Sequence, residues 1–214
     1  MDIPTHSADL TVSILLGQIE SFWDGSFRPH LDGLEDEEYM WEPTKGSLSL
    51  RPGARHGNPR GTFPSLVPEP SNIGINPEAP VTPDGTMRHP PPNKMKTIAW
   101  QMGNMSVLLA KKVENPGKLA RQDFRSFPYT LSAREAVDQL DEYYGAWVQG
   151  LKSLLDSDLP RPIGPEQGPW HEDWLGLSLS HTHRWLIQTG AEILLMRDFY
   201  ALHGRPSFDH FPRS

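Results

Sequence analysis

The chain of 214 residues contains no cysteine. Disulfide bonds, thiolate nucleophiles and zinc sites built on thiolates are therefore excluded. It also lacks any apolar run approaching the roughly 20 residues that a bilayer requires. The N-terminal residues show no basic stretch followed by an apolar one, so we expect no signal peptide. Together these absences predict a cytoplasmic protein without a membrane partner.

Positive charge is also scarce. The chain has 20 Lys and Arg against 27 Asp and Glu, which gives a formal net charge of -7. Nucleic-acid binding depends on clustered Lys and Arg, and no such cluster is visible, so nucleic acid is not an expected partner. The isolated pair Lys111–Lys112 is interpreted as part of a solvated helix face.

Proline, by contrast, is abundant and unevenly placed. Of 22 prolines, 12 lie between Pro43 and Pro92. Proline removes backbone donors and glycine adds conformational entropy, so residues 43–94 are expected to be irregular. We interpret the chain as one domain, residues 1–214, in which this segment is a long insertion. An ordered cover over part of the domain is favoured, and disorder is the alternative.

The rest of the chain shows helical periodicity. Apolar residues recur at spacings of three and four over residues 9–31 and 96–114, from Ser132 to the turn at 158–168, and over 172–203. Ser132 and Glu135 fit a capping box at the start of the third segment. Gly204 and Pro206 predict the end of the fourth. No convincing strand pattern appears, so the prediction is an all-α fold, a four-helix bundle.

Several segments of the sequence resemble one protein family. They are WEPTKGSLSLRP (41–52), TIAWQMGNM (97–105), LDEYYGAWVQGLKSL (140–154), RPIGPEQGP (161–169) and HTHRWLIQTGAEILLMRDFYA (181–201). In this order they resemble the DinB-like superfamily, and most of all its actinobacterial, mycothiol-transferase-like members. The resemblance covers nearly the whole chain except the proline-rich insertion. It implies a four-helix bundle, and it implies a homodimer as one arrangement, because DinB-like bundles often pair.

The resemblance also implies where a metal would lie. Metal-dependent members hold a divalent ion with a His from the second helix and two side chains four residues apart on the last helix, which share a helix face. Those positions correspond here to Asn104, Trp185 and Thr189, with Gln188 where a further His often stands. Amide and hydroxyl oxygens are weak ligands for zinc or nickel, and indole is none. We therefore expect no metal and no cofactor.

A small-molecule site is the alternative use of these positions. Helical phase places one stripe on the last helix, made of Ser178, His181, Trp185, Gln188, Thr189, Glu192 and Met196. The family geometry makes this stripe a pocket wall, and an ordinary surface is the alternative. A buried Asn104 needs hydrogen-bond partners, which Gln188 or Thr189 could supply. The predicted substrate-binding residues are Asn104, Trp185, Gln188, Thr189, Trp100 and Gln101.

Two residues are candidates for proton transfer. His181 lies on the Trp185 side of the helix, and Glu192 could accept a proton, so both are predicted catalytic residues. A surface His, and a Glu that pairs with an Arg or caps the pocket rim, are the plainer alternatives. His183, two residues from His181, points about 160° away from it and is expected to pack in the core. Arg197 and Asp198 are expected to form structural contacts.

Three functions remain open. The first is a metal-free protein that binds a small ligand or substrate and performs, if it is an enzyme, a cyclisation, isomerisation or rearrangement. The second is a metal-dependent thiol S-transferase or hydrolase, in which His181, Glu192 and a His of the insertion converge. The third is a non-catalytic dimeric interaction module with an exposed stripe at Trp185. The sequence does not decide whether the protein is an enzyme.

Overall fold

The computed structural model describes residues 10–45, 47–52, 64–65, 95–113, 127–163 and 174–204. For residues 51, 52, 64, 65, 111 and 113 only the backbone is described. Most of the predicted insertion at 43–94 lies outside the described residues, as do His56, His89 and the end of the predicted turn at 158–168. The prediction of an ordered cover is therefore not addressed by the structure.

The described part of the chain is mostly helical, as the periodicity predicted. The helices are α1 (Leu10–Phe22), the short α2 (Asp36–Met40), α3 (Ile98–Val113), α4 (Ala133–Lys152) and α5 (Leu175–His203). Two-residue strands β1 (Arg51–Pro52) and β2 (Pro64–Ser65) pair antiparallel. Within the described residues no helix combines the length and apolar character needed to cross a membrane.

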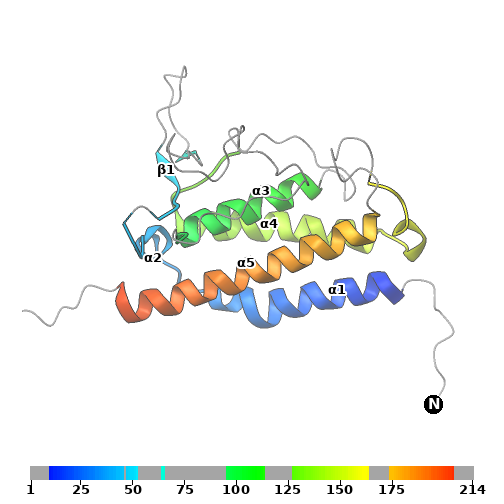
Figure 1. Cartoon of the computed structure of the whole chain (residues 1–214), viewed down its shortest axis with the longest axis horizontal. Helices are drawn as coiled ribbons and strands as arrows, with labels where there is room; N and C mark the ends of the chain where they lie inside the picture. Colours follow the sequence, from blue (N-terminus) through cyan, green and yellow to red (C-terminus); the bar gives the residue numbers. More distant parts are fainter. Residues whose placement is uncertain are drawn as a thin grey trace, which may run out of the picture.

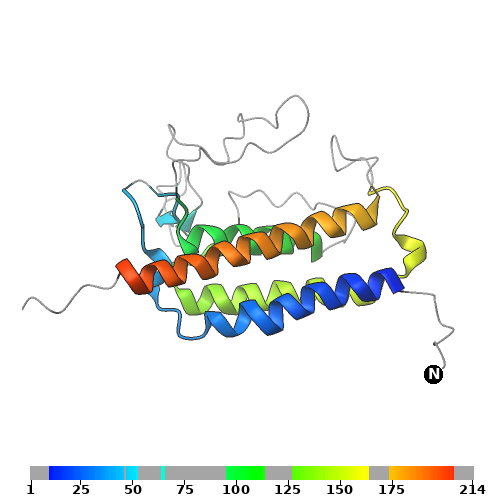
Figure 2. The ribbon, with the colours of Figure 1, turned by 60° about the horizontal axis from the view of Figure 1, so that its bottom comes forward.

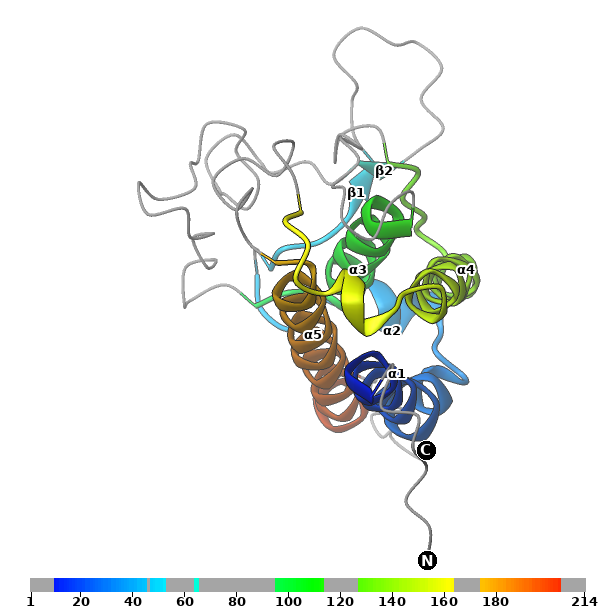
Figure 3. The same cartoon turned by 90° about the vertical axis from the view of Figure 1, so that its right-hand side faces the viewer.

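The four long helices lie side by side (Figure 1). Along the chain colours, α1 and α5 run in one direction and α3 and α4 in the other (Figure 2). Seen along their axes, the four helices surround a common interior (Figure 3). Helix α3 packs against α4 and α5, and α1 packs against the same two helices. The largest fully buried side chains include Trp147, Tyr39, Tyr129 and Phe27, so aromatic rings fill much of this interior.

The first helix was predicted to extend to residue 31, but it does not continue as a regular α-helix over that range. After α1 comes a π-helical turn, η1 (Trp23–Phe27), and then a 3-10 turn, η2 (Arg28–Leu31), which contains Pro29. A π-helical turn re-aims the side chains that follow it. Here Trp23 stacks flat on Tyr144 of α4, with ring centroids 3.7 Å apart. The aromatic contact therefore coincides with the departure from regular α-helix.

Helix α5 approaches this turn through a glycine. A Cβ atom at Gly190 would overlap the ring of Phe22 and lie 3.1 Å from Phe27 Cδ2. Any larger side chain would push these rings outward, because protein interiors have few voids. Gly190 thus permits the close contact between α5 and the end of α1.

The start of α4 was predicted correctly, but its predicted cap is wrong. Ser132 is the N-cap residue, yet its side chain makes no capping hydrogen bond. Instead Asp36 of α2 accepts the Ala133 N–H at 2.6 Å, and Thr130 Oγ1 accepts the Ser132 N–H at 3.0 Å. Thr130 also donates to Glu135 at 2.5 Å. The carboxylate of Asp36, which is distant in the sequence, therefore caps the start of α4 where the local motif predicted the Ser132 hydroxyl.

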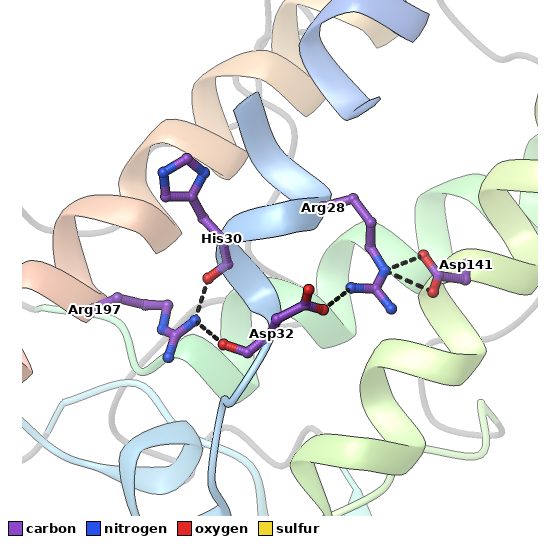
Figure 4. A network of polar contacts seen from close by, with 5 residues as sticks. All are labelled: Arg28, His30, Asp32, Asp141 and Arg197. Atoms are coloured by element: carbon purple, nitrogen blue, oxygen red, sulfur yellow. Dashed lines mark hydrogen bonds and ion pairs between the residues drawn. The ribbon is translucent and has the colours of Figure 1, made fainter. Parts of the chain in front are cut away.

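Ion pairs and hydrogen bonds connect the end of the first helical segment, at η2, to α4 and α5. Arg28 donates from Nε to Asp141 of α4 at 2.8 Å and from Nη1 to Asp32 at 2.7 Å. Arg197 of α5 donates to the backbone oxygens of His30 and Asp32 (Figure 4). It also pairs with Glu38 at 2.8 Å. The expected structural role of Arg197 agrees with these contacts, which tie α5 to η2 and α2.

Candidate functional site

Two polar contacts define how α3 faces α5. Lys96 Nζ, just before α3, lies 2.7 Å from Glu192 Oε2, and Lys112 Nζ lies 3.0 Å from Ser178 Oγ. The two helices therefore run antiparallel. For two residues that face each other across this interface, the residue numbers add up to about 289. Both helices rise about 1.5 Å per residue, so this register continues between the two contacts. It brings Asn104 to the level of Trp185, and Trp100 to the level of Thr189.

Asn104 is buried, with 8 % of its surface exposed. Its Nδ2 donates to the Trp100 carbonyl oxygen of its own helix at 2.8 Å. The expected hydrogen bonds to Gln188 and Thr189 are absent from the described part of the structure. Gln188 is exposed and donates to Glu192 at 3.4 Å, while Thr189 is buried. An amide oxygen accepts up to two hydrogen bonds, so Asn104 retains acceptor capacity at the α3–α5 interface.

Two tryptophans border Asn104. Trp185 and Trp100 are both half-buried and packed against the edge of the core. Lys96 Nζ lies 5.9 Å from the centroid of the Trp100 ring, within the range of a cation–π contact. By the α3–α5 register, Trp100 and Asn104 of α3 lie at the levels of Thr189 and Trp185 of α5. We call these four residues the α3–α5 seam.

The two predicted catalytic residues do not belong to one site. His181 is exposed, whereas Glu192 forms an ion pair with Lys96, where the plainer alternative had expected an Arg. Eleven residues of α5 separate them, a distance of about 16 Å along the helix axis. Side chains so far apart cannot ligate one ion or exchange a proton with the same substrate atom. A rearranged metal site that uses both is therefore excluded by helix geometry.

Gln101 and His183 are both buried polar side chains. Gln101 is 2 % exposed, and its Oε1 has no hydrogen-bond partner among the described residues. His183 is fully buried, as expected, and its ring meets Trp147 edge-on at 6.0 Å. Neither ring nitrogen of His183 finds a partner in this part of the chain, and burial lowers its pKa to about 4. The role of Gln101 in a binding site stays a prediction.

Lys112 is the residue that sequence reasoning missed. The prediction of a solvated face is wrong for it, because only 6 % of its surface is exposed. Within the described residues no carboxylate pairs with its ammonium group, and burial lowers its pKa to about 8. Its helical phase was the available signal, since Lys112 follows Asn104 and Leu108 at steps of four along one face. The side chain of Lys111 lies outside the described residues.

The residues at the family's metal positions do not fit a divalent ion. Asn104, Trp185 and Thr189 offer an amide, an indole and a hydroxyl, which are poor ligands for zinc or nickel. Among the residues that the structure describes, no three His, Asp or Glu side chains gather where an ion could bind.

No protein-family model matches the chain, and no curated protein or solved structure gives a match.

Proposed function

We propose that the chain is a DinB-like four-helix bundle whose metal site has been replaced by a neutral binding site for a small, partly aromatic molecule. The observation that carries the proposal is the α3–α5 register, which brings Asn104 level with Trp185 and Trp100 level with Thr189. These are residues at, or next to, the positions where the resemblance puts the metal.

The chemistry of the seam favours such a ligand. Two half-buried indoles offer apolar faces, and apolar surfaces with a few fixed polar groups are typical of small-molecule sites. The Asn104 amide supplies a hydrogen-bonding group at the level of Trp185. The four seam side chains carry no formal charge, so a neutral or aromatic part of a ligand suits them.

The dimeric alternative has a different basis. Leu195 and Leu202 of α5 are 66 % and 76 % exposed, which would suit a contact with a second chain. Trp185, however, packs against the core and is not the exposed centre that this alternative predicted. The exposed leucines therefore keep the dimer as an alternative without favouring it over ligand binding.

Fluorescence titration with anilinonaphthalene sulfonate tests the proposed seam. We expect saturable binding to the intact chain, and a loss of about tenfold in affinity in Trp185→Ala, since burying an aromatic side chain is worth about 1.5–3 kcal/mol. Asn104→Ala should weaken binding less. Trp174→Ala is the matched control, because Trp174 is 64 % exposed and lies before α5.

Unchanged affinity in both seam variants would overturn the assignment. Metal analysis of the same purified protein separates the alternatives. Near-stoichiometric zinc or nickel would support the metal-dependent thiol transferase, and the seam proposal would fall with it.

A further inference from the structure

A buried amine and a reachable hydroxyl meet where α3 ends and α5 begins. Lys112 of α3 is 6 % exposed, and its Nζ lies 3.0 Å from Ser178 Oγ. Ser178 itself is only partly buried. In the part of the chain that the structure describes, no carboxylate lies against Lys112 to balance a positive charge. Removing an unpaired ammonium from water is costly, so burial lowers the pKa of Lys112 to about 8 and makes the neutral amine available at mildly alkaline pH.

The neutral amine changes the role of the contact. An ammonium group can only donate, whereas a neutral lysine Nζ carries a lone pair that accepts a proton. The Ser178 hydroxyl then donates to Lys112, and the amine becomes a base within hydrogen-bond distance of an alcohol. The neighbouring Thr182 hydroxyl is already committed, because it donates to the Ser178 carbonyl oxygen at 2.8 Å.

The position of Ser178 adds a second favourable element. Ser178 lies in the first turn of α5, a helix of 29 residues. The positive end of a helix dipole stabilises negative charge in this turn. An alkoxide forming at Ser178, or an oxyanion on a carbonyl attacked by it, would lie in that field. His181, the nearest titratable residue along α5, is exposed and one turn away.

We propose that Ser178 and Lys112 form a nucleophile–base pair that accepts an acyl group from an ester. This activity goes beyond ligand binding in the seam and does not depend on it. Ser178 Oγ attacks the carbonyl carbon of the ester while Lys112 Nζ takes the hydroxyl proton. The C–O bond to the leaving group then breaks, and Lys112 returns the proton to the departing alcohol. Water, attacking the acyl-serine with Lys112 as base, releases the acid and restores Ser178.

The test uses the full chain and p-nitrophenyl acetate. We expect release of nitrophenol above the buffer rate, and an acetyl group on Ser178 when the acid-quenched protein is digested and analysed by mass spectrometry. The rate should rise with pH through about 8, where Lys112 loses its proton. Ser178→Ala and Lys112→Met should each lower the rate at least tenfold and abolish the acetyl-serine.

Matched controls keep the test specific. Ser180→Ala removes an exposed serine two residues away, and Lys152→Met removes a lysine that pairs with Glu20, so both should retain the rate. Lys112→Arg keeps a positive charge but supplies no base, so this variant should be inactive. Its melting temperature should show that the variant is folded. Acetyl found on Lys112 Nζ, or an unchanged rate in Ser178→Ala, would overturn the proposal.

Discussion

The two lysines at the ends of the α3–α5 interface meet α5 in opposite ways. Lys96 faces a carboxylate, Glu192, at 2.7 Å, and both side chains are partly exposed, at 26 % and 37 %. Among the described residues Lys112 faces only the hydroxyl of Ser178, and it is almost fully buried. The same residue type is thus partly solvated and paired at one end of the interface, and at the other it is desolvated with no counter-charge in the described part of the chain.

The difference separates a structural contact from a chemical one. An exposed ion pair contributes about 0–1 kcal/mol to stability and leaves its lysine protonated. A buried lysine without a carboxylate costs stability while protonated, and this cost is the same effect that lowers its pKa. Perturbed bases of this kind gather at functional sites more often than elsewhere. The comparison therefore directs experiments to the Lys112 end.

His183 extends the comparison to a buried base whose ring nitrogens have no hydrogen-bond partner among the described residues, and it carries the largest expected effect. Its folded-state pKa of about 4 lies below the usual 6.5. Between these values the unfolded chain binds the proton that the folded chain refuses, so stability falls as the pH drops from about 6.5 towards 4. The 2.5-unit difference corresponds to about 3 kcal/mol. Urea unfolding from pH 7 to pH 4.5 measures this loss.

The control for this prediction is His183→Leu, which cannot take up a proton. Its unfolding free energy should depend less on pH over the same interval, because the carboxylates still titrate but the imidazole is gone. Equal slopes in the His183 variant and the intact chain would show that His183 gains a proton acceptor or solvent in the folded state.

Lys112→Met tests the comparison between the two lysines by removing the positive charge of Lys112. At pH 7 the intact chain holds a protonated lysine in a buried site, and methionine fills a similar volume without that penalty. We expect the variant to gain about 2 kcal/mol of stability at pH 7, within the range of about 1–4 kcal/mol for replacing buried charged groups by apolar residues of similar volume. Between about pH 8 and 10.5, Lys112 has lost its proton in the folded chain but keeps it in the unfolded chain. The stability of the intact chain should therefore rise with pH, and the stability gained by the variant should shrink. Thermal unfolding at pH 7 and pH 10 measures both.

Lys152→Met is the control for this stabilisation. Lys152 is 47 % exposed and pairs with Glu20 at 2.9 Å, so its removal should not stabilise the chain. If Lys112→Met were destabilising at pH 7, the ammonium group would have a counter-charge or solvent that the proposed base lacks. The acyl-transfer proposal would then lose its physical basis.

The sequence was sufficient for the helices because their signals are local. Periodic apolar residues located α3, α4 and α5 to within a few residues, and Gly204 correctly marked the end of α5. The first helix was predicted as one piece, since nothing local announces that Trp23 must stack on Tyr144. The cap of α4 failed for a similar reason. Asp36, 97 residues before Ala133, takes the place of the adjacent Ser132 hydroxyl.

The site was harder to predict because it depends on which residues face each other across two helices. Helical phase grouped Asn104, Trp185 and Thr189 as one predicted site, but it could not give the register between the two helices. The eleven-residue spacing of His181 and Glu192 along α5 was visible in the sequence, whereas the burial of Lys112 depends on the facing helix and was not. Burial of a lysine depends on the neighbouring helix, so its sequence neighbours, including Lys111, gave a misleading signal.

The smallest expected effect sharpens the comparison at the Lys96 end. Glu192→Gln replaces the carboxylate by a neutral amide of the same shape, so Lys96 loses its charged partner but keeps its contact with Trp100. A double-mutant cycle with Lys96→Met should give a coupling of about 0.5 kcal/mol, as exposed ion pairs do. In 1 M salt, where charges are screened over about 3 Å, the coupling should nearly vanish. A salt-resistant coupling above about 2 kcal/mol would mean that Lys96 is as desolvated as Lys112, because only poorly hydrated pairs escape screening. The two ends would then differ in their partners alone, and the lack of a carboxylate, not burial, would distinguish Lys112.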